Sequence, residues 1–264
     1  MKTVPFTLSH AAAALPFRRT RLIPSALVVG TFGPDLEYFV RLVPGGHFGH
    51  TLLGVFVLDL PVCLIVLWIF HAYMRGPIEA LLPQSIQRRL SPGPHRFRFW
   101  GAGRLALIIA SILVGTGTHI LWDSFTHHTF WPYRHWTFLR DATYLPILGT
   151  VKIYQIIQYG SSVVGGVILL IWLALWYRTT RTVDRPLDGT LSPSRKWGLI
   201  VGMLSVATSA GLIRGFAKTG LPNSRGTIEQ LVGYVVVTIL SVLWLQLLGW
   251  GILWSRRKES RPRV

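Results

Sequence analysis

Acidic residues and cysteines are scarce in this sequence of 264 residues. It contains 10 aspartates and glutamates against 27 lysines and arginines, and only 14% of its residues are charged. Its single cysteine, Cys63, lies within an apolar run, and a lone cysteine excludes an intramolecular disulfide. No polar stretch is long enough to form a soluble basic domain, so the net charge of +17 does not indicate a nucleic-acid partner.

Apolar residues, in contrast, are abundant. They make up 50% of the chain, and the mean hydropathy is +0.44, values that predict an integral membrane protein. Five apolar runs each approach the ~20 residues that cross a bilayer core. These runs cover residues 51–74, 101–122, 156–177, 197–217 and 230–254. We therefore predict an all-α fold, a polytopic transmembrane helical bundle with five spans.

Two shorter apolar segments precede these spans. Residues 5–16 predict a short helix with His10 in its middle. Residues 22–43 are interrupted at Gly33 and Pro34, a pair that breaks or caps a helix and predicts a re-entrant or tilted segment. We expect one or two short membrane-associated helices here. The whole chain is then divided into a membrane-embedded part with the candidate site, residues 1–178, and a C-terminal two-helix membrane hairpin with a basic tail, residues 179–264.

The basic residues cluster between the apolar runs. They are concentrated in residues 75–100, in residues 178–196 and in the C-terminal tail. Five spans place these three segments on one side, and the positive-inside rule makes that side cytoplasmic. We expect a multi-pass protein of the cytoplasmic (inner) membrane, with a cytoplasmic C-terminus and with its basic clusters against anionic membrane lipid.

The end of the second span carries the clearest chemical signal. His119 and Asp123 are four residues apart, so they lie one turn apart on one helical face. Imidazole nitrogens and carboxylate oxygens bind divalent zinc, manganese or iron. Further histidines and an aspartate fall near the ends of other apolar segments, and the topology brings the outer ends of the first two spans together. We predict a divalent-metal site at the outer membrane interface, with zinc as the favoured ion. Its predicted ligands are His10, Asp35, His50, His119 and Asp123.

Three more histidines are candidates for catalysis beside that site. His47 is three residues before His50, which places both on one face if the helix has already begun there. His127 continues the face of Asp123 by another turn, and His128 lies beside it. We predict that His47, His127 and His128 act as further ligands or as proton shuttles. Each histidine also has a simpler interpretation as a solvated interfacial residue, and Asp35 could cap a helix.

Four motifs resemble an uncharacterised bacterial membrane family known as domain of unknown function 4184. They read PFTLSHAAAALPF, GPDLEYF, GHTLLGVFVLDLP and THILWDSFTH, and the resemblance covers most of residues 4–175. The motif order is also similar to that of YdjM-like membrane-bound metal-dependent hydrolases and of the zinc-dependent phospholipase C group. The latter resemblance implies metal ligands at His10, Asp35, His50, His119, Asp123, and His127 or His128. This chain lacks the final His-x3-Glu pair of that group, which favours one or two ions over three.

These patterns support a first hypothesis, a metal-dependent hydrolase of phosphoester or lipid-linked substrates. A metal ion activates water and polarises a phosphoryl oxygen, and the nearby cations of Arg134, Arg140 and Lys152 could hold a phosphate. Two non-enzymatic alternatives remain, a transporter or channel and a membrane scaffold. The transporter hypothesis depends on Asp59, because a carboxylate inside a span is costly. A structural ion pair with Arg214 is the competing explanation for Asp59.

Overall fold

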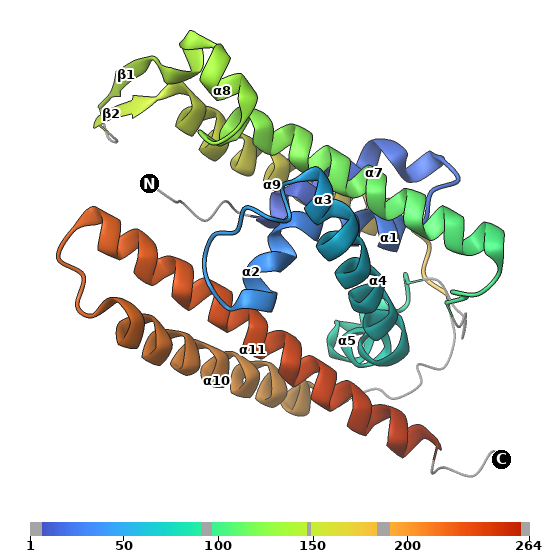
Figure 1. Ribbon diagram of the computed structural model, residues 1–264. Helices are drawn as coiled ribbons and strands as arrows, with labels where there is room; N and C mark the ends of the chain where they lie inside the picture. Colours follow the sequence, from blue (N-terminus) through green and yellow to red (C-terminus); the bar gives the residue numbers. More distant parts are fainter. Residues whose placement is uncertain (1–6, 91–96, 147–148, 184–190, 260–264) are drawn as a thin grey trace.

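The computed structural model describes residues 7–90, 97–146, 149–183 and 191–259. Within these ranges the chain is an all-α bundle with one short β-hairpin (Figure 1). Five helical stretches are long and apolar enough to cross a membrane. They are Leu52–Leu81, Ala102–His135, Ile153–Thr179, Pro193–Thr219 and Gly226–Arg256. The predicted polytopic bundle with five spans is therefore confirmed, and the protein is a multi-pass membrane protein.

The first span is a composite helix. Two π-helical turns interrupt it, and its consecutive segments are α3 (Leu52–Gly54), η3 (Val55–Asp59), α4 (Leu60–Ile69), η4 (Phe70–Met74) and α5 (Arg75–Leu81). A short helix, α6 (Gln84–Gln87), follows it. The remaining spans are built on α7 (Ala102–Thr126), α9 (Ile153–Thr179), α10 (Pro193–Thr219) and α11 (Arg225–Glu259). Their outward side chains are apolar, and Leu170 and Ile213 are 67% and 71% exposed. Apolar exposure on this scale fits a surface solvated by lipid.

The N-terminal region consists of several short helical pieces. They are the 3₁₀ helix η1 (Thr7–Arg19), α1 (Pro24–Gly30), the 3₁₀ turn η2 (Gly33–Asp35) and α2 (Leu36–Arg41). Residues 22–43 are thus three pieces rather than one tilted helix, because Pro34 has no backbone N–H to continue a helix through it. None of these pieces is long enough to span a bilayer.

A small layer lies at one end of the bundle, beyond the end of α7 and the start of α9 (Figure 1). It contains α8 (Trp131–His135), η5 (Thr137–Arg140) and an antiparallel hairpin of β1 (Ala142–Leu145) and β2 (Gly149–Lys152). The opposite end holds the basic segments. There Arg89 donates to the carbonyl of Tyr177 at 2.8 Å, and Lys196 donates to that of Leu82 at 2.6 Å. Of the predicted basic clusters, Arg96, Arg185, Arg261 and Arg263 lie outside the described residues.

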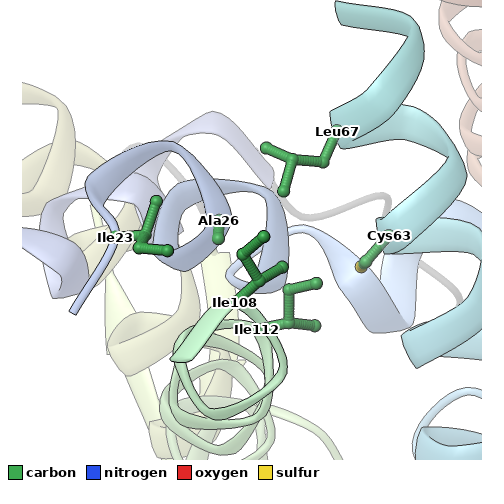
Figure 2. Packing of buried hydrophobic residues seen from close by; sticks show 6 residues of the cluster. All are labelled: Ile23, Ala26, Cys63, Leu67, Ile108 and Ile112. Carbon is green, nitrogen blue, oxygen red and sulfur yellow. The ribbon is translucent and has the colours of Figure 1, made fainter. Parts of the chain in front are cut away.

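The buried core lies where α1, α4 and α7 meet. Figure 2 shows its central side chains, which are Ile23, Ala26, Cys63, Leu67, Ile108 and Ile112. The backbones of α1 and α7 approach closely at two glycines. A Cβ atom on Gly30 would lie 2.3 Å from the carbonyl oxygen of Ile112, and one on Gly115 would lie 2.3 Å from that of Leu27. Small residues permit this kind of close packing between membrane helices.

Polar side chains of α7 satisfy the free backbone groups at both ends of α1. The Ser111 hydroxyl accepts a hydrogen bond from the Ile23 N–H at 2.9 Å, and the Thr116 hydroxyl donates to the Gly30 carbonyl at 3.2 Å. A seven-residue helix leaves unsatisfied amides and carbonyls at each end, which are costly when buried. The packing of α1 against α7 is therefore fixed by hydrogen bonds as well as by the glycines.

The Gly115→Ala substitution should destabilise the protein, because its methyl group would overlap the α1 backbone. Overpacking of this kind costs about 1–3 kcal/mol, so the midpoint of thermal unfolding in detergent should fall. Gly117→Ala is the matched control on the same helix, since no atom lies within 4 Å of its added Cβ. Equal melting temperatures for the two variants would contradict the close approach.

Candidate metal centre

The five residues predicted to bind metal converge on one point from four parts of the chain. His10 comes from η1, Asp35 from η2, His50 from the loop before α3, and His119 and Asp123 from α7. Asp35 and His119 are 0% exposed, and the others are buried or nearly so. Two groups within this set could hold an ion, one of His10, His119 and Asp123 and the other of Asp35, His50 and His119.

The separations of these donor atoms from Asp123 and from Asp35 are of the size found between ligands of one ion. Asp123 Oδ2 lies 3.2 Å from His119 Nε2 and 3.3 Å from His50 Nε2, and Asp123 Oδ1 lies 3.5 Å from His10 Nε2. Asp35 Oδ1 lies 3.8 Å from His119 Nε2 and 4.0 Å from His50 Nε2. Ligands about 2.1 Å from a metal ion are roughly 3 to 4 Å from one another. The residues present therefore match the donor set of a divalent metal.

His119 is oriented by α1. Its Nδ1–H donates to the carbonyl oxygen of Thr31 at 2.7 Å, so Nε2 carries the lone pair when the ring is neutral. The Nε2 atom is buried and lies 3.2 Å from the Asp123 carboxylate. Histidines that bind metals usually donate their other N–H to a carbonyl or carboxylate in this way. His119 is therefore oriented as a metal-binding histidine is, with Nε2 facing the centre of the cluster.

His10 contributes a second neutral imidazole. Its ring stacks on that of His119, with the ring centroids 4.1 Å apart. Burial, together with the neighbouring His119, lowers the pKa of His10 to about 4 against the opposing effect of Asp123. At neutral pH His10 is consequently uncharged, which is the form of histidine that coordinates a metal.

Asp35 does not act as a helix cap. It occupies the N-cap position of α2, yet its side chain makes no capping hydrogen bond. The carboxylate instead faces His119 and His50. The simpler interpretation of Asp35 as a capping residue is therefore wrong.

A cavity of about 120 Å³ lies beside the metal-ligand cluster. Its wall includes the three predicted catalytic residues, His47, His127 and His128. His127 is the one nearest the cluster, with Nδ1 3.6 Å from Asp123 Oδ2 and Nε2 3.3 Å from the amide nitrogen of Gln158. The other lining residues are Tyr38, Gly45, Gly46, His50, Thr126, Thr129, Phe130, Tyr154 and Gln158.

The placement of His47 differs from the sequence prediction. Helix α3 begins only at Leu52, where the Thr51 side chain caps it by accepting the N–H of Gly54. His47 and His50 therefore lie in a loop and share no helical face. His50 reaches Asp123, whereas His47 is exposed on the cavity wall. His127 likewise follows the last residue of α7 in an extended conformation instead of continuing the helix.

Asp59 and Arg214 do not form the ion pair considered from the sequence. Arg214 donates instead to the Leu42 carbonyl at 2.5 Å and to the Thr238 hydroxyl at 3.1 Å. Asp59 is 0% exposed, and both of its oxygens lack a hydrogen-bond partner among the described residues. Of the predicted phosphate-binding cations, Arg134 and Arg140 are exposed away from the cavity wall. Lys152 donates to Tyr133, whose ring contacts the cavity residue Tyr154.

Sequence reasoning missed two contributors to the site. The first is the backbone carbonyl of Thr31, which no side-chain pattern could reveal. The second is Glu37, a buried acid whose sequence context is that of an ordinary first helical turn. A usable signal existed for Thr116 and Thr126, since they continue the spacing of His119 and Asp123 along one face of α7.

Comparison with known proteins gives a family without an assigned activity. The profile of the family described as Domain of unknown function (DUF4184) matches residues 4–251. The chain belongs to this family. No curated protein and no solved structure matched it. For this member of the family, the likeness to YdjM-like hydrolases and to phospholipase C rests on motif order alone.

Purified protein should contain a stoichiometric divalent metal, with zinc expected. The double variant His119→Ala/Asp123→Ala should lose the metal, because it removes donors of both candidate groups. Elemental analysis of the detergent-purified protein measures this directly. His135→Ala is the control, since this histidine is exposed and outside the cluster. Absence of metal from the wild type, even after reconstitution with zinc, manganese and iron, would contradict the site.

Proposed function

We propose that the protein is a membrane-bound, divalent-metal-dependent hydrolase with its site at the outer membrane interface. The observation that carries this proposal is the buried Nε2 of His119. This atom lies among four other donors of metal-binding type, and Nδ1–H already donates to Thr31. Histidines that bind metals are usually oriented by a hydrogen bond of this kind.

The chemistry follows from the arrangement of the cluster and the cavity. When bound, a divalent ion would lower the pKa of a coordinated water toward neutrality and polarise a substrate oxygen. His127 lies between the cluster and the cavity, where its imidazole can accept or deliver a proton. Gln158 donates to His127 Nε2 and so orients the ring. We assign proton transfer to His127, and contacts with substrate to His47 and His128.

The proposed substrates are phosphoesters or lipid-linked molecules. A cavity of about 120 Å³ holds a small polar head rather than a whole lipid, and its histidine, tyrosine and threonine donors suit an anion. The adjoining α8 and η5 expose Trp131, Trp136 and Phe138, as aromatic belts at membrane interfaces do. We place this end outside the cytoplasmic (inner) membrane and the C-terminus in the cytoplasm, on the basis of the basic segments at the opposite end.

Hydrolysis tests the proposal. The metal-loaded wild type should cleave at least one member of a panel of phosphodiester and phosphomonoester amphiphiles, and chelation should abolish turnover. His119→Ala should remove activity together with the metal. His127→Ala should retain the metal and lose about 10²–10⁴-fold in kcat, the usual contribution of proton transfer. Turnover by His119→Ala equal to that of the wild type would refute the assignment.

Transport is a second candidate function, favoured by Asp59 alone. This carboxylate is fully buried within the first span, and its oxygens lack hydrogen-bond partners in the described part of the chain. Intramembrane carboxylates of this kind mark ion or proton paths in many transporters. If this function holds, liposomes containing the protein should conduct protons or cations, and Asp59→Asn should abolish the flux while His119→Ala spares it. Equal flux in protein-free liposomes would remove this candidate.

A further inference from the structure

Glu37 is a second buried carboxylate beside the metal-ligand cluster. It lies on α2, two residues after Asp35, and is 3% exposed. A buried charge needs partners, and Glu37 has them both in the loop before α3 and on its own helix. Its Oε2 accepts the backbone N–H of Gly49 at 3.0 Å, and its Oε1 accepts from Arg41 Nη1 at 2.7 Å. Burial alone would raise the pKa of Glu37, but these bonds outweigh it and lower the pKa below its ordinary value.

The loop that carries His50 lies directly on this carboxylate. A Cβ atom on Gly46 would be 2.4 Å from both Cδ and Oε2 of Glu37. At Gly49 a Cβ would lie 2.7 Å from the Pro34 carbonyl oxygen. Only glycine at both positions lets the backbone approach so closely. The loop therefore lies against Glu37 of α2 at one point and against Pro34 of η2 at a second, which immediately precedes His50.

His50 needs such a support because no regular structure fixes it. The residues from Gly45 to His50 belong to no helix or strand, and α3 begins only at Leu52. A metal centre requires its donors to be held within about 0.5 Å of their working positions. Helix α2 positions two donors of the cluster. Asp35 at its N-cap faces the cluster directly, and Glu37 holds the loop that carries His50.

We propose that Glu37 is a positioning residue of the metal centre. It holds the loop from Gly45 to His50 so that His50 Nε2 meets Asp35 and Asp123. The proposal rests on the proposed metal-dependent function, and it assigns Glu37 no contact with metal or substrate. Arg41 Nη1 donates to the other carboxylate oxygen, Oε1, from the next turn of α2.

Zinc affinity of the full-length protein, measured by competition with a chelator, tests this role. Glu37→Ala should weaken zinc binding about 10–100-fold, the usual cost of removing a group that orients a metal ligand. Glu37→Gln should lose less, because its amide oxygen can still accept the Gly49 N–H. Gly46→Ala should weaken binding as well, since its methyl group would displace the loop from Glu37.

The matched control is Glu79→Ala. Glu79 also forms an i,i+4 pair with an arginine, Arg75, at 2.8 Å, but on the first span away from the cluster. This variant should bind zinc within about twofold of the wild type. Zinc binding by Glu37→Ala as tight as that of the wild type would overturn the positioning role.

Hydrogen exchange of the metal-free protein separates this inference from the proposed function. In Glu37→Ala, peptides covering residues 43–51 should exchange faster than in the wild type, while those in α4 should be unchanged. Glu79→Ala should leave residues 43–51 unaffected. If the wild type binds no metal, the proposed function fails, and this measurement alone decides whether Glu37 holds the loop. Unchanged exchange of residues 43–51 in Glu37→Ala would refute it.

Discussion

The hydrogen bonds between α7 and the two ends of α1 are the constraint on which the rest of the structure depends. Helix α1 is too short to satisfy its own terminal amides and carbonyls, and bulk water is absent from the interior of a membrane protein. Ser111, Thr116 and His119 supply the missing partners from one face of α7. The same contact that completes α1 sets the tautomer of His119. The hydrogen bonds from α7 to α1 therefore both fix the helix packing and orient His119 in the candidate site.

Charge balance is the second constraint on the cluster. Asp35 and Asp123 are both buried, and each lies within 4.0 Å of histidine nitrogens. Two carboxylates in a medium of low polarity require compensating positive charge. A divalent ion held by neutral histidines would supply it in full. Without an ion, protons on the imidazoles must do so, and metal and protons then compete for the same nitrogens.

Much of this architecture is visible in the sequence, because it depends on local periodicity. Hydropathy located the five spans, and the four-residue spacing of His119 and Asp123 correctly placed both on one buried face of α7. Motif order grouped His10, Asp35 and His50 with them, and the structure brings all five together. Whether they bind metal stays a prediction.

The features that escaped prediction depend on contacts between distant segments. Glu37 is buried because the loop with Gly46 and Gly49 lies on it. The residues next to these glycines in the sequence give no indication of that contact. The shared face expected for His47 and His50 was wrong, because Thr51 starts the helix after them. The ion pair of Asp59 with Arg214, one of two explanations considered for Asp59, is not formed, because Arg214 contacts the Leu42 carbonyl at the end of α2.

The dependence of α1 on α7 also has a consequence for biogenesis. A chain inserted into the membrane from its N-terminus presents η1, α1 and α2 long before α7 exists, and none of these pieces can span a bilayer. The backbone ends of α1 lack their α7 partners until residues 111–119 arrive. Residues 7–41 can therefore complete their packing only after α7 is in place, which makes assembly of the candidate site depend on insertion of the second span.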